Sequence, residues 1–474
     1  MIALPSQLFN FHRLSNVGVG AFSRVFALGS QFVVLILLGR LLPKVDFGNF
    51  MIVFALTRLL SQGMGTGLAT LLVYHISRKA SETTELRLHR SVVALSLTIN
   101  GFVCAGLILG APTIAHWFQK PALATWIVSL APFALFSTLL TTSVGVFDGR
   151  GRITQSILAS EFFPNLIRLI ALPPLLFFSF RNQAVAAVMT VSVLIPWLFI
   201  ARQLVRQLDS GFSPLTRWDL QYSGKLTLHS FAAMQMQGID MLVVGWLFSS
   251  VVAADYAIAS RVAALIPFFQ QIIVKGFMAK AGRAIHDGDN AALQQEVDSC
   301  RAQSTLLVTV TAVATLLAYP ILMLGMGNFS NTLPLMAALA ASPVVRSYFP
   351  GADALLRIAG YADFSLGIML GSGAFIIIFP LLLHQWLGIY SLALGMFASA
   401  ILLNPAIAAY LRRHMHVELV SSSAWVPIGG ILAGCGICMA YRGSTLLWLT
   451  GVAILGASLL PTYLRVRTTK RFSL

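Results

Sequence analysis

Ionisable side chains inside long apolar segments are the residues of this sequence that could do chemistry. Three arginines, Arg24, Arg58 and Arg261, lie in such segments with no acid within one helical turn on the same segment. A charge at membrane depth costs about 2.5–3.5 kcal/mol on insertion scales, so it usually faces a cavity or a partner. Guanidinium groups bind phosphate oxygens in a bidentate manner. We therefore expect the three arginines to line one cavity and to form an anion site.

Asp240 and Gln237 offer oxygen atoms in another apolar segment. Asp240 is the only acid deep in that segment, and Gln237 lies about one helical turn before it. Hard cations bind oxygen ligands, so this pair could hold a coupling ion. Alternatively, Asp240 neutralises Arg24 or Arg261 and holds a gate closed. The residues leave both roles open.

Two acid–base pairs are spaced seven residues apart in apolar segments. They are Glu161 with Arg168 and Arg346 with Asp353. Side chains seven apart share one face of a continuous helix. We expect these four residues to form structural or gating ion pairs, with Glu161 neutralising either Arg168 or an arginine of another helix.

The apolar segments that carry these residues predict an all-α polytopic membrane protein. The chain is 57% hydrophobic and 10% charged, whereas soluble domains carry about 25% charged residues. About 20 apolar residues span a bilayer, and backbone groups in lipid must be paired within the segment, which favours helices. We predict fourteen spans: Asn16–Leu42, Phe47–Tyr74, Ser91–Ile114, Leu123–Phe147, Thr154–Phe178, Ala184–Leu204, Leu226–Phe248, Ala253–Phe277, Ser304–Leu324, Leu333–Leu355, Phe364–Leu383, Ile389–Leu411, Ser423–Tyr441 and Leu446–Leu464.

The distribution of Lys and Arg predicts the orientation of these spans. With the N-terminus in the cytoplasm, 21 of the 32 basic residues fall on the cytoplasmic side, five on the opposite side and six within spans. Positive loops face the cytoplasm, so both termini are expected there. The net charge of +16 then reflects topology and anionic lipid, and no nucleic-acid partner is needed. No basic stretch precedes the first apolar segment, so we expect no cleaved signal peptide.

An internal repeat divides the chain. A gapless shift of 206 residues aligns Leu37–Leu59 with Val243–Leu265, and a shift of 209 aligns Arg150–Arg152 with Ala359–Tyr361. Similar shifts indicate two six-helix halves of like orientation followed by a helix pair, and parallel repeats are typical of transporters. The predicted divisions are an N-terminal half at 1–222, a C-terminal half at 223–415, and a helix pair with a basic tail at 416–474.

Two stretches, Gly39–Phe50 (GRLLPKVDFGNF) and Gly145–Leu169 (GVFDGRGRITQSILASEFFPNLIRL), together with fourteen spans in two halves, resemble the polysaccharide-exporter flippases. These O-antigen and exopolysaccharide translocases belong to the multidrug/oligosaccharidyl-lipid/polysaccharide superfamily. The resemblance implies translocation of a polyprenyl-pyrophosphate-linked oligosaccharide from the cytoplasmic to the outer leaflet of the inner membrane by alternating access. The product would be a cell-surface polysaccharide such as lipopolysaccharide or exopolysaccharide. A polysaccharide polymerase and a chain-length regulator are the implied partners.

The related lipid II flippases extend the resemblance to single residues. They carry cavity arginines on helices one, two and eight, which resemble Arg24, Arg58 and Arg261, and some carry a helix-seven aspartate in a sodium site, which resembles Asp240. Here the eleventh span departs from that pattern, because its acid, Asp363, lies at its start. The resemblance implies Na+ or H+ coupling and no cofactor or resident metal.

Three other classes of protein fit the sequence less well. An ATP-driven pump is disfavoured because the sequence has no G-x-x-x-x-G-K-[ST] motif. An ion-coupled multidrug antiporter of the same superfamily is the transporter alternative, although arginines outnumber acids in the spans. A membrane glycan polymerase or ligase is the enzyme alternative, although every predicted external connection is short. We therefore expect a transporter and not an enzyme.

Cys435 and Cys438 lie inside an apolar span, where packing is the expected role of a C-x-x-C.

Overall fold

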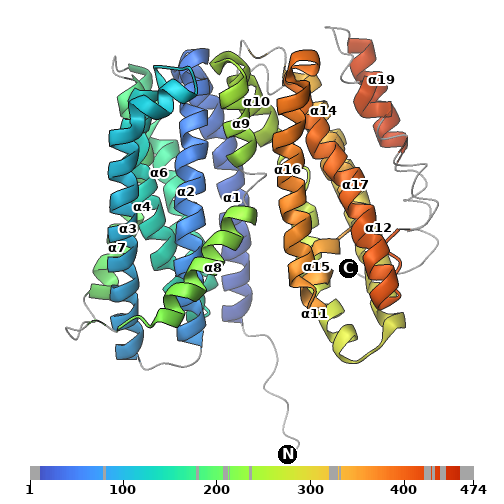
Figure 1. Ribbon diagram of the computed structural model, residues 1–474, viewed down its shortest axis with the longest axis horizontal. Helices are drawn as coiled ribbons and strands as arrows, with labels where there is room; N and C mark the ends of the chain where they lie inside the picture. The colour runs from blue at the N-terminus through green and yellow to red at the C-terminus, as the bar shows by residue number, and fades with distance from the viewer. Residues whose placement is uncertain are drawn as a thin grey trace, which may run out of the picture. The chain divides into compact units, whose positions relative to one another are not determined.

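The computed structural model describes residues 11–77, 82–177, 181–205, 212, 214–233, 238–319, 329, 332–420, 429, 433–437 and 445–458. Every regular element in these ranges is helical, and the chain forms two compact units, Met1–Trp246 and Leu247–Leu474. The described elements of the first unit are α1 (Phe11–Leu41), α2 (Lys44–Ser77), α3 (Glu82–Trp117), α4 (Leu123–Gly149), α5 (Ile153–Ile157), the π-helical η1 (Leu158–Phe162), α6 (Phe163–Ala171), the 3-10 helix η2 (Pro173–Phe177), α7 (Arg181–Val205), α8 (Arg217–Ala233) and α9 (Asp240–Leu247) (Figure 1).

The second unit is helical in the same way, and its core lies between the helices that follow α9. The described elements are α10 (Ser250–Ala263), α11 (Phe268–His286), α12 (Asn290–Leu317), α14 (Thr332–Arg346), α15 (Ala352–Ile358), α16 (Ala362–Leu387), α17 (Tyr390–Met415) and α19 (Thr445–Ala457). The core includes Val308 of α12, Val344 of α14 and Leu411 of α17, all of which are buried. α14 packs against α10, α12 and α17.

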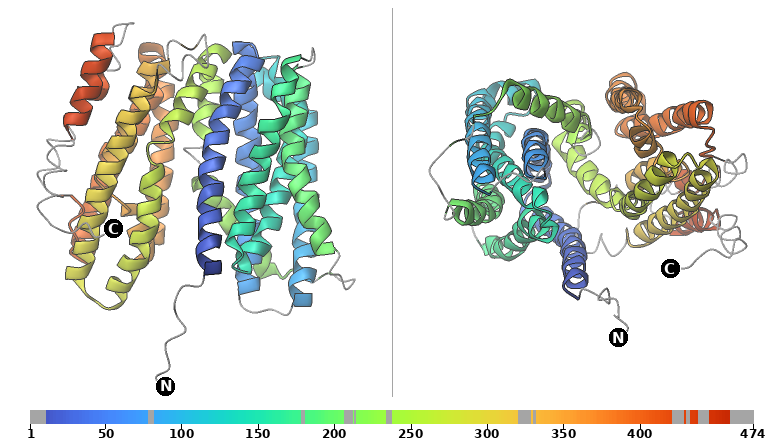
Figure 2. Two further views of the ribbon diagram at one scale, coloured as in Figure 1. Left: turned by 180° about the vertical axis from the view of Figure 1, so that it is seen from behind. Right: turned by 90° about the horizontal axis from the view of Figure 1, so that it is seen from below.

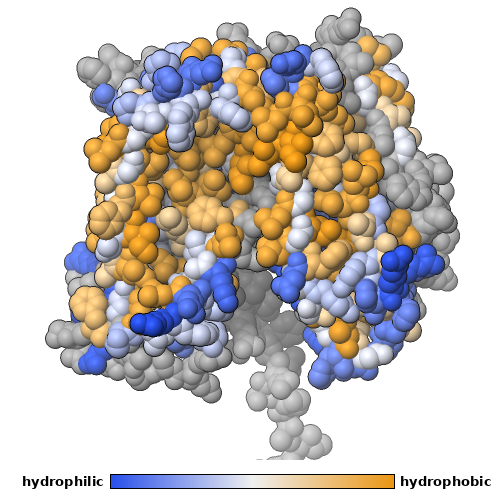
Figure 3. Space-filling model, viewed as in Figure 1, coloured by the Kyte–Doolittle hydropathy of each residue, from blue (hydrophilic) through white to orange (hydrophobic). Residues whose placement is uncertain are grey.

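Length and composition make this a multi-pass membrane protein. Among the described residues, seven helices are long and apolar enough to cross a bilayer, and three shorter apolar helices accompany them. In each unit, hydrophobic residues cover the middle of the helices on the face drawn in Figure 3, and hydrophilic residues gather at the helix ends. The predicted all-α polytopic fold is confirmed, while the number of fourteen spans stays a prediction.

Several predicted spans contain more than one helix. The fifth span is assembled from α5, η1, α6 and η2; the change from η1 to α6 lies next to Pro164, and η2 begins at Pro173. The tenth span contains α14 and α15, separated by residues 347–351, and Gly351 there has a positive φ of 63°. Proline lacks the N–H of a helical hydrogen bond, and glycine readily adopts a left-handed conformation. These residues explain the change from η1 to α6, the start of η2 and the turn before α15.

Glycines of α2 allow close contact with α8. A Cβ atom on Gly67 would clash with Thr227 Oγ1 and would lie 2.8 Å from the carbonyl oxygen of Ser223. Small residues at such contacts allow helix backbones to approach closely in a membrane. As a result α8 lies along α2 (Figure 1), and the first unit extends to Trp246, beyond the half boundary predicted at 222. The predicted three-part division of the chain stays a prediction.

Candidate functional site

The three predicted cavity arginines lie in three helices and two units. Arg24 is in α1, and its side chain lies outside the part of the chain that the structure describes. Arg58 is near the middle of α2 and is partly exposed, although Thr57 beside it is fully buried. Arg261 is partly exposed in the last turn of α10, in the second unit. The convergence of these three guanidinium groups on one cavity stays a prediction.

Asp240 lies alongside the part of α2 that carries Arg58. A Cβ on Gly238 would lie 3.5 Å from the Ala55 carbonyl oxygen, and a Cβ on Gly245 would lie 2.8 Å from the Ile52 side chain. Asp240, between these two glycines, is 5% exposed. Opposite charges on adjoining segments lower the cost of placing either charge at membrane depth. The structure therefore brings Asp240 and Arg58 to adjoining segments of the first unit.

Both acids in the spans of this unit lie at π-helical turns. Glu161 is within η1, and residues 238–239, immediately before Asp240, are also π-helical. Turns of this kind are rare and occur frequently at functional sites, and the sequence reasoning missed them. The second predicted oxygen ligand, Gln237, lies outside the described residues.

The turn that carries Glu161 packs against α1. The ring of Phe162, its neighbour, lies 4.7 Å from the ring of Phe26 in α1, and η1 and α6 lie beside α1 (Figure 2). The carbonyl oxygen of Glu161 accepts a hydrogen bond of 2.7 Å from Nδ2 of Asn165. Helix α1, which carries the predicted cavity residue Arg24, and the π-helical turn at Glu161 are thus direct neighbours.

Arg168 is held by neutral groups of three helices. Its Nε donates to Ser192 Oγ in α7 at 2.9 Å, and its Nη1 donates to Asn165 Oδ1 at 3.4 Å. The guanidinium carbon lies 5.8 Å from the centre of the Phe133 ring in α4, in a cation–π arrangement. These contacts attach α6 to its neighbours. An ion pair between Arg168 and Glu161 stays a prediction.

Asp353 forms its ion pair with an arginine of its own short helix. Nη2 of Arg357 lies 2.9 Å from Asp353 Oδ2, and the hydroxyl of Ser365 donates to Oδ1. Arg346, seven residues earlier, ends α14, and its Nη2 donates to Ser399 Oγ and Ser372 Oγ. The spacing of seven assumed one continuous helix, whereas residues 347–351 separate α14 from α15. An additional pair between Arg346 and Asp353 stays a prediction.

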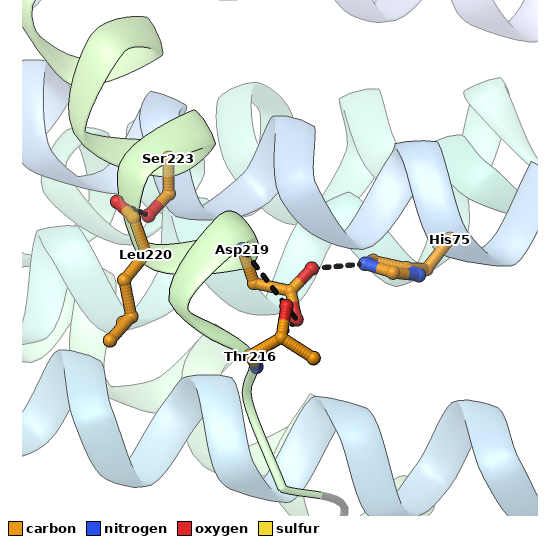
Figure 4. Close-up of polar contacts among 5 residues, drawn as sticks. All are labelled: His75, Thr216, Asp219, Leu220 and Ser223. Carbon is orange, nitrogen blue, oxygen red and sulfur yellow. Dashed lines mark hydrogen bonds and ion pairs between the residues drawn. The ribbon is translucent and has the colours of Figure 1, made fainter.

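A polar cluster at the start of α8 was not predicted. His75 Nε2, at the end of α2, lies 2.7 Å from Asp219 Oδ1 (Figure 4). The N–H and the hydroxyl of Thr216 donate to Asp219 Oδ2 at 2.8 and 2.7 Å, and the N–H of Asp219 donates back to Thr216 Oγ1 at 3.2 Å. This reciprocal pattern is a capping box. The T-x-x-D sequence before the helix was the signal that could have revealed it.

The charge of Asp219 is stabilised by these partners. Burial raises the pKa of Asp219, but the hydrogen bonds from Thr216 and His75 lower it by more, so its pKa lies below its ordinary value. The aromatic rings of Trp218 and Tyr222 stack beside the cluster with centroids 4.8 Å apart. The cluster therefore attaches the first turn of α8 to the end of α2, outside the predicted span Leu226–Phe248.

Solved structures of transporters share this fold. The lipid II flippase MurJ in an inward closed conformation is 14% identical, with a TM-score of 0.73 over 97% of this chain and 100% of that chain. An inward-facing multidrug resistance MATE family transporter of the MOP superfamily is 16% identical, with a TM-score of 0.69 over 82% and 94% of the two chains. A MOP superfamily transporter from Pyrococcus furiosus is 14% identical, with a TM-score of 0.57 over 84% and 95%.

The family follows from the sequence match. A search of curated proteins found no match. The family described as "Polysaccharide biosynthesis protein" matches residues 14–276, which is more than half of the chain and includes Arg24, Arg58, Asp240 and Arg261. The predicted membership of a polysaccharide family is confirmed, and the fold is the one found in transporters of the multidrug/oligosaccharidyl-lipid/polysaccharide (MOP) superfamily. The chain belongs to the polysaccharide biosynthesis protein family and has the transporter fold of the MOP superfamily.

Proposed function

We propose that this protein is a flippase that translocates a polyprenyl-pyrophosphate-linked oligosaccharide from the cytoplasmic to the outer leaflet by alternating access. Membership of the polysaccharide biosynthesis family supports the substrate class. The likeness to the lipid II flippase over nearly the whole chain supports the transporter fold. The observation that carries the proposal is Arg58, a partly exposed arginine near the middle of the mostly apolar helix α2, which lies within the residues that the family matches.

The arginines would solve the physical difficulty of such a substrate. A pyrophosphate that leaves water for a bilayer loses its hydration, which is costly for any charge. Arg24, Arg58 and Arg261 would replace that hydration with charge-assisted hydrogen bonds, while the polyprenyl tail stays in the hydrocarbon. Each hydrogen bond to a charged group contributes about 1.5–3 kcal/mol. The pyrophosphate is common to all substrates of this class, so one cationic site would serve different glycans.

The cellular setting belongs to the same proposal. The protein would lie in the inner membrane with both termini in the cytoplasm and would supply lipopolysaccharide or exopolysaccharide biosynthesis. A polysaccharide polymerase would use the flipped glycan in the outer leaflet, and a chain-length regulator would act with that polymerase. The charge asymmetry of the loops supports this orientation.

Asp240 and Gln237 are proposed to couple transport to Na+ or H+. Asp240 is buried beside the segment of α2 that carries Arg58. A carboxylate that exchanges between an arginine and a cation would link ion binding to the conformational cycle. Glycan transport into vesicles should therefore accelerate under an imposed sodium or proton gradient. A rate indifferent to both gradients would leave Asp240 as a counter-ion.

Complementation of a glycan-export defect tests the proposed function. Arg58→Ala and Arg261→Ala should abolish or strongly reduce export at normal protein levels, and Arg58→Lys should retain part of it, because an ammonium lacks the planar fork of a guanidinium. Arg412→Ala is the matched control, since Arg412 is exposed and pairs with Glu418. Full export by both alanine variants would contradict the proposal. Drug resistance without glycan export would favour a multidrug antiporter, the alternative suggested by the MATE fold.

A further inference from the structure

The polar face of α6 points into the first unit. Phe163 and Ile170 of this helix are 43% and 66% exposed, as expected of side chains that face lipid. Successive residues of an α-helix lie about 100° apart around its axis, so Asn165 and Arg168 lie on the opposite side of α6. Asn165 is 4% exposed, and Ser192 of α7, which Arg168 contacts, is fully buried. The Arg168 guanidinium therefore extends into the protein and away from lipid.

Most hydrogen-bond donors of Arg168 are not used by the protein. A guanidinium carries five N–H groups. Nε donates to Ser192 Oγ at 2.9 Å, and Nη1 makes one longer contact, of 3.4 Å, with Asn165 Oδ1. In the described part of the chain Nη2 has no hydrogen bond, and it is not one of the fully buried side-chain atoms that lack a partner. Nη2 is therefore open to solvent, and the three remaining N–H groups of Nη1 and Nη2 are available to a ligand.

The groups that hold Arg168 are neutral and are themselves fixed. Among the described residues they are Ser192, Asn165 and the ring of Phe133, whose centre lies 5.8 Å from the guanidinium carbon. The Ser192 hydroxyl donates to the Met189 carbonyl oxygen at 2.6 Å, so its oxygen is held toward Arg168. A preorganised group loses little entropy when it binds a ligand, and a charge in a span usually faces a cavity or a partner. An anion would supply the charge that these neutral groups lack.

An aromatic contact connects Arg168 with the part of α2 that carries Arg58. The Phe133 ring, which Arg168 approaches, lies 5.3 Å from the ring of Phe54. Phe54 is four residues before Arg58 in α2, so the side chains of these two residues lie on one face of that helix. Arg58 and Arg168 thus lie near the same pair of rings, on two helices of the first unit.

We propose that Arg168 is a further anion-binding residue of the first unit and donates from Nη1 and Nη2 to a phosphate oxygen of the transported lipid pyrophosphate. The identity of this ligand rests on the proposed function, whereas the open cationic group rests on the contacts above. A guanidinium binds phosphate through two parallel N–H···O bonds, and the remaining donors of Arg168 lie on its two terminal nitrogens. Ser192 and Asn165 position the guanidinium for this contact.

Titration calorimetry on the purified full-length protein in detergent tests this inference. The ligand is farnesyl pyrophosphate, and farnesol is the matched ligand without an anion. Wild-type protein should bind farnesyl pyrophosphate and prefer it to farnesol, and Arg168→Ala should weaken its binding about tenfold or more. Arg152→Ala is the control variant and should bind as the wild type does, because Arg152 is exposed between α4 and α5 of the same unit.

Two conservative variants separate anion binding from a purely structural role of Arg168. Arg168→Lys retains the charge, whereas Arg168→Gln retains only the ability to form hydrogen bonds with the neutral neighbours. The lysine variant should therefore bind farnesyl pyrophosphate more tightly than the glutamine variant. Ser192→Ala keeps the guanidinium and removes the group that orients it, so it should weaken binding by roughly threefold. It reports on the site even where Arg168→Ala fails to fold.

The same titrations identify the source of the phosphate. Inorganic pyrophosphate should compete with farnesyl pyrophosphate, and phosphatidylglycerol added to the detergent should not. Equal competition by phosphatidylglycerol would assign the site to a phospholipid headgroup and overturn the proposed ligand. Equal affinities of the lysine and glutamine variants, or equal losses in Arg168→Ala and Arg152→Ala, would overturn the site. Weaker binding in Arg58→Ala without any loss in Arg168→Ala would overturn this inference alone, whereas no binding by the wild type would contradict the proposed function as well.

Discussion

At the scale of single residues, Asp219 shows how the chain stabilises a charge next to the membrane. Its two carboxylate oxygens accept hydrogen bonds from His75 and from the N–H and hydroxyl of Thr216. These partners favour the ionised form, and the pKa of Asp219 is lowered in the folded protein although burial acts in the opposite direction. The ionised carboxylate consequently stabilises the folded state.

Stability should depend on pH through Asp219. An unfolded aspartate has a pKa of about 3.9, so the contribution is fully present above that pH and is lost as the pH falls through the lower folded pKa. Asp219→Asn should lower the free energy of unfolding by about 1.5–3 kcal/mol near neutral pH, as for hydrogen bonds to a charged group. The deficit relative to the wild type should disappear in acid.

Thermal unfolding of the purified protein between pH 3 and pH 7 measures this effect. Asp287→Asn is a suitable control, because Asp287 is exposed in the turn between α11 and α12. The role of Asp219 would be wrong if Asp219→Asn and Asp287→Asn had the same stability at every pH.

At the scale of elements, α2 is the helix on which the first unit is assembled. It packs against α4 on one side and α8 on another. Gly67 contacts α8, and Gly145 of α4 lies so close to α2 that a Cβ there would be 2.7 Å from the Ala69 carbonyl oxygen. Backbone atoms cannot move aside as a flexible side chain can, so these contacts require glycine.

Gly67→Ala and Gly106→Ala should therefore have opposite outcomes. The new Cβ at Gly67 meets the Thr227 hydroxyl and the α8 backbone, so α8 must shift, and we expect a loss of about 1–3 kcal/mol from overpacking. Gly106 is in α3, and a Cβ atom added there would have nothing within 4 Å. Alanine is therefore expected to be neutral or stabilising at this position. Thermal midpoints of the two variants in the same detergent give the comparison. Equal midpoints would show that α8 does not lie on α2 as described.

The sequence predicted helices well and their interruptions poorly. Hydropathy located the apolar segments because a span needs a long apolar run. Hydropathy averaged over a long window did not reveal the turns at 347–351 in the tenth span or the π-helical turn at Glu161. Pro350 and Gly351 were local signals of the turns at 347–351. Spacing rules then placed Arg346 and Asp353 on one continuous helix, whereas residues 347–351 separate α14 from α15.

The candidate site was predictable only as far as residue types allowed. Burial of charge in an apolar span pointed to Arg58 and Asp240 as residues of interest, and the structure places them on adjoining segments of the first unit. Partners such as Ser192 for Arg168 and His75 for Asp219 depend on contacts between helices distant in sequence. A single sequence contains no local signal for those contacts.

At the scale of the whole molecule, the charge of the loops predicts how the protein is oriented. In a variant whose four native cysteines are replaced by serine, Ala122→Cys lies in the exposed turn between α3 and α4, and Asp287→Cys lies in the exposed turn between α11 and α12. The positive-inside distribution places the first turn outside and the second in the cytoplasm. A membrane-impermeant thiol reagent added to intact cells should label only the cysteine at 122. Labelling at 287 would reverse the topology.

Translocation itself is the most direct test of the account. Purified protein is reconstituted into vesicles with a polyprenyl-pyrophosphate-linked oligosaccharide in both leaflets, and a membrane-impermeant glycosidase reports how much of the glycan is accessible. Wild-type protein should make the whole pool accessible, while vesicles without protein expose only the outer-leaflet share. Arg58→Ala should slow the process about tenfold or more, because a charged hydrogen bond to the pyrophosphate is lost. The account would be contradicted if wild-type protein left only the outer-leaflet share of the glycan accessible to the glycosidase. It would also be contradicted if Arg58→Ala translocated the glycan as fast as the wild type.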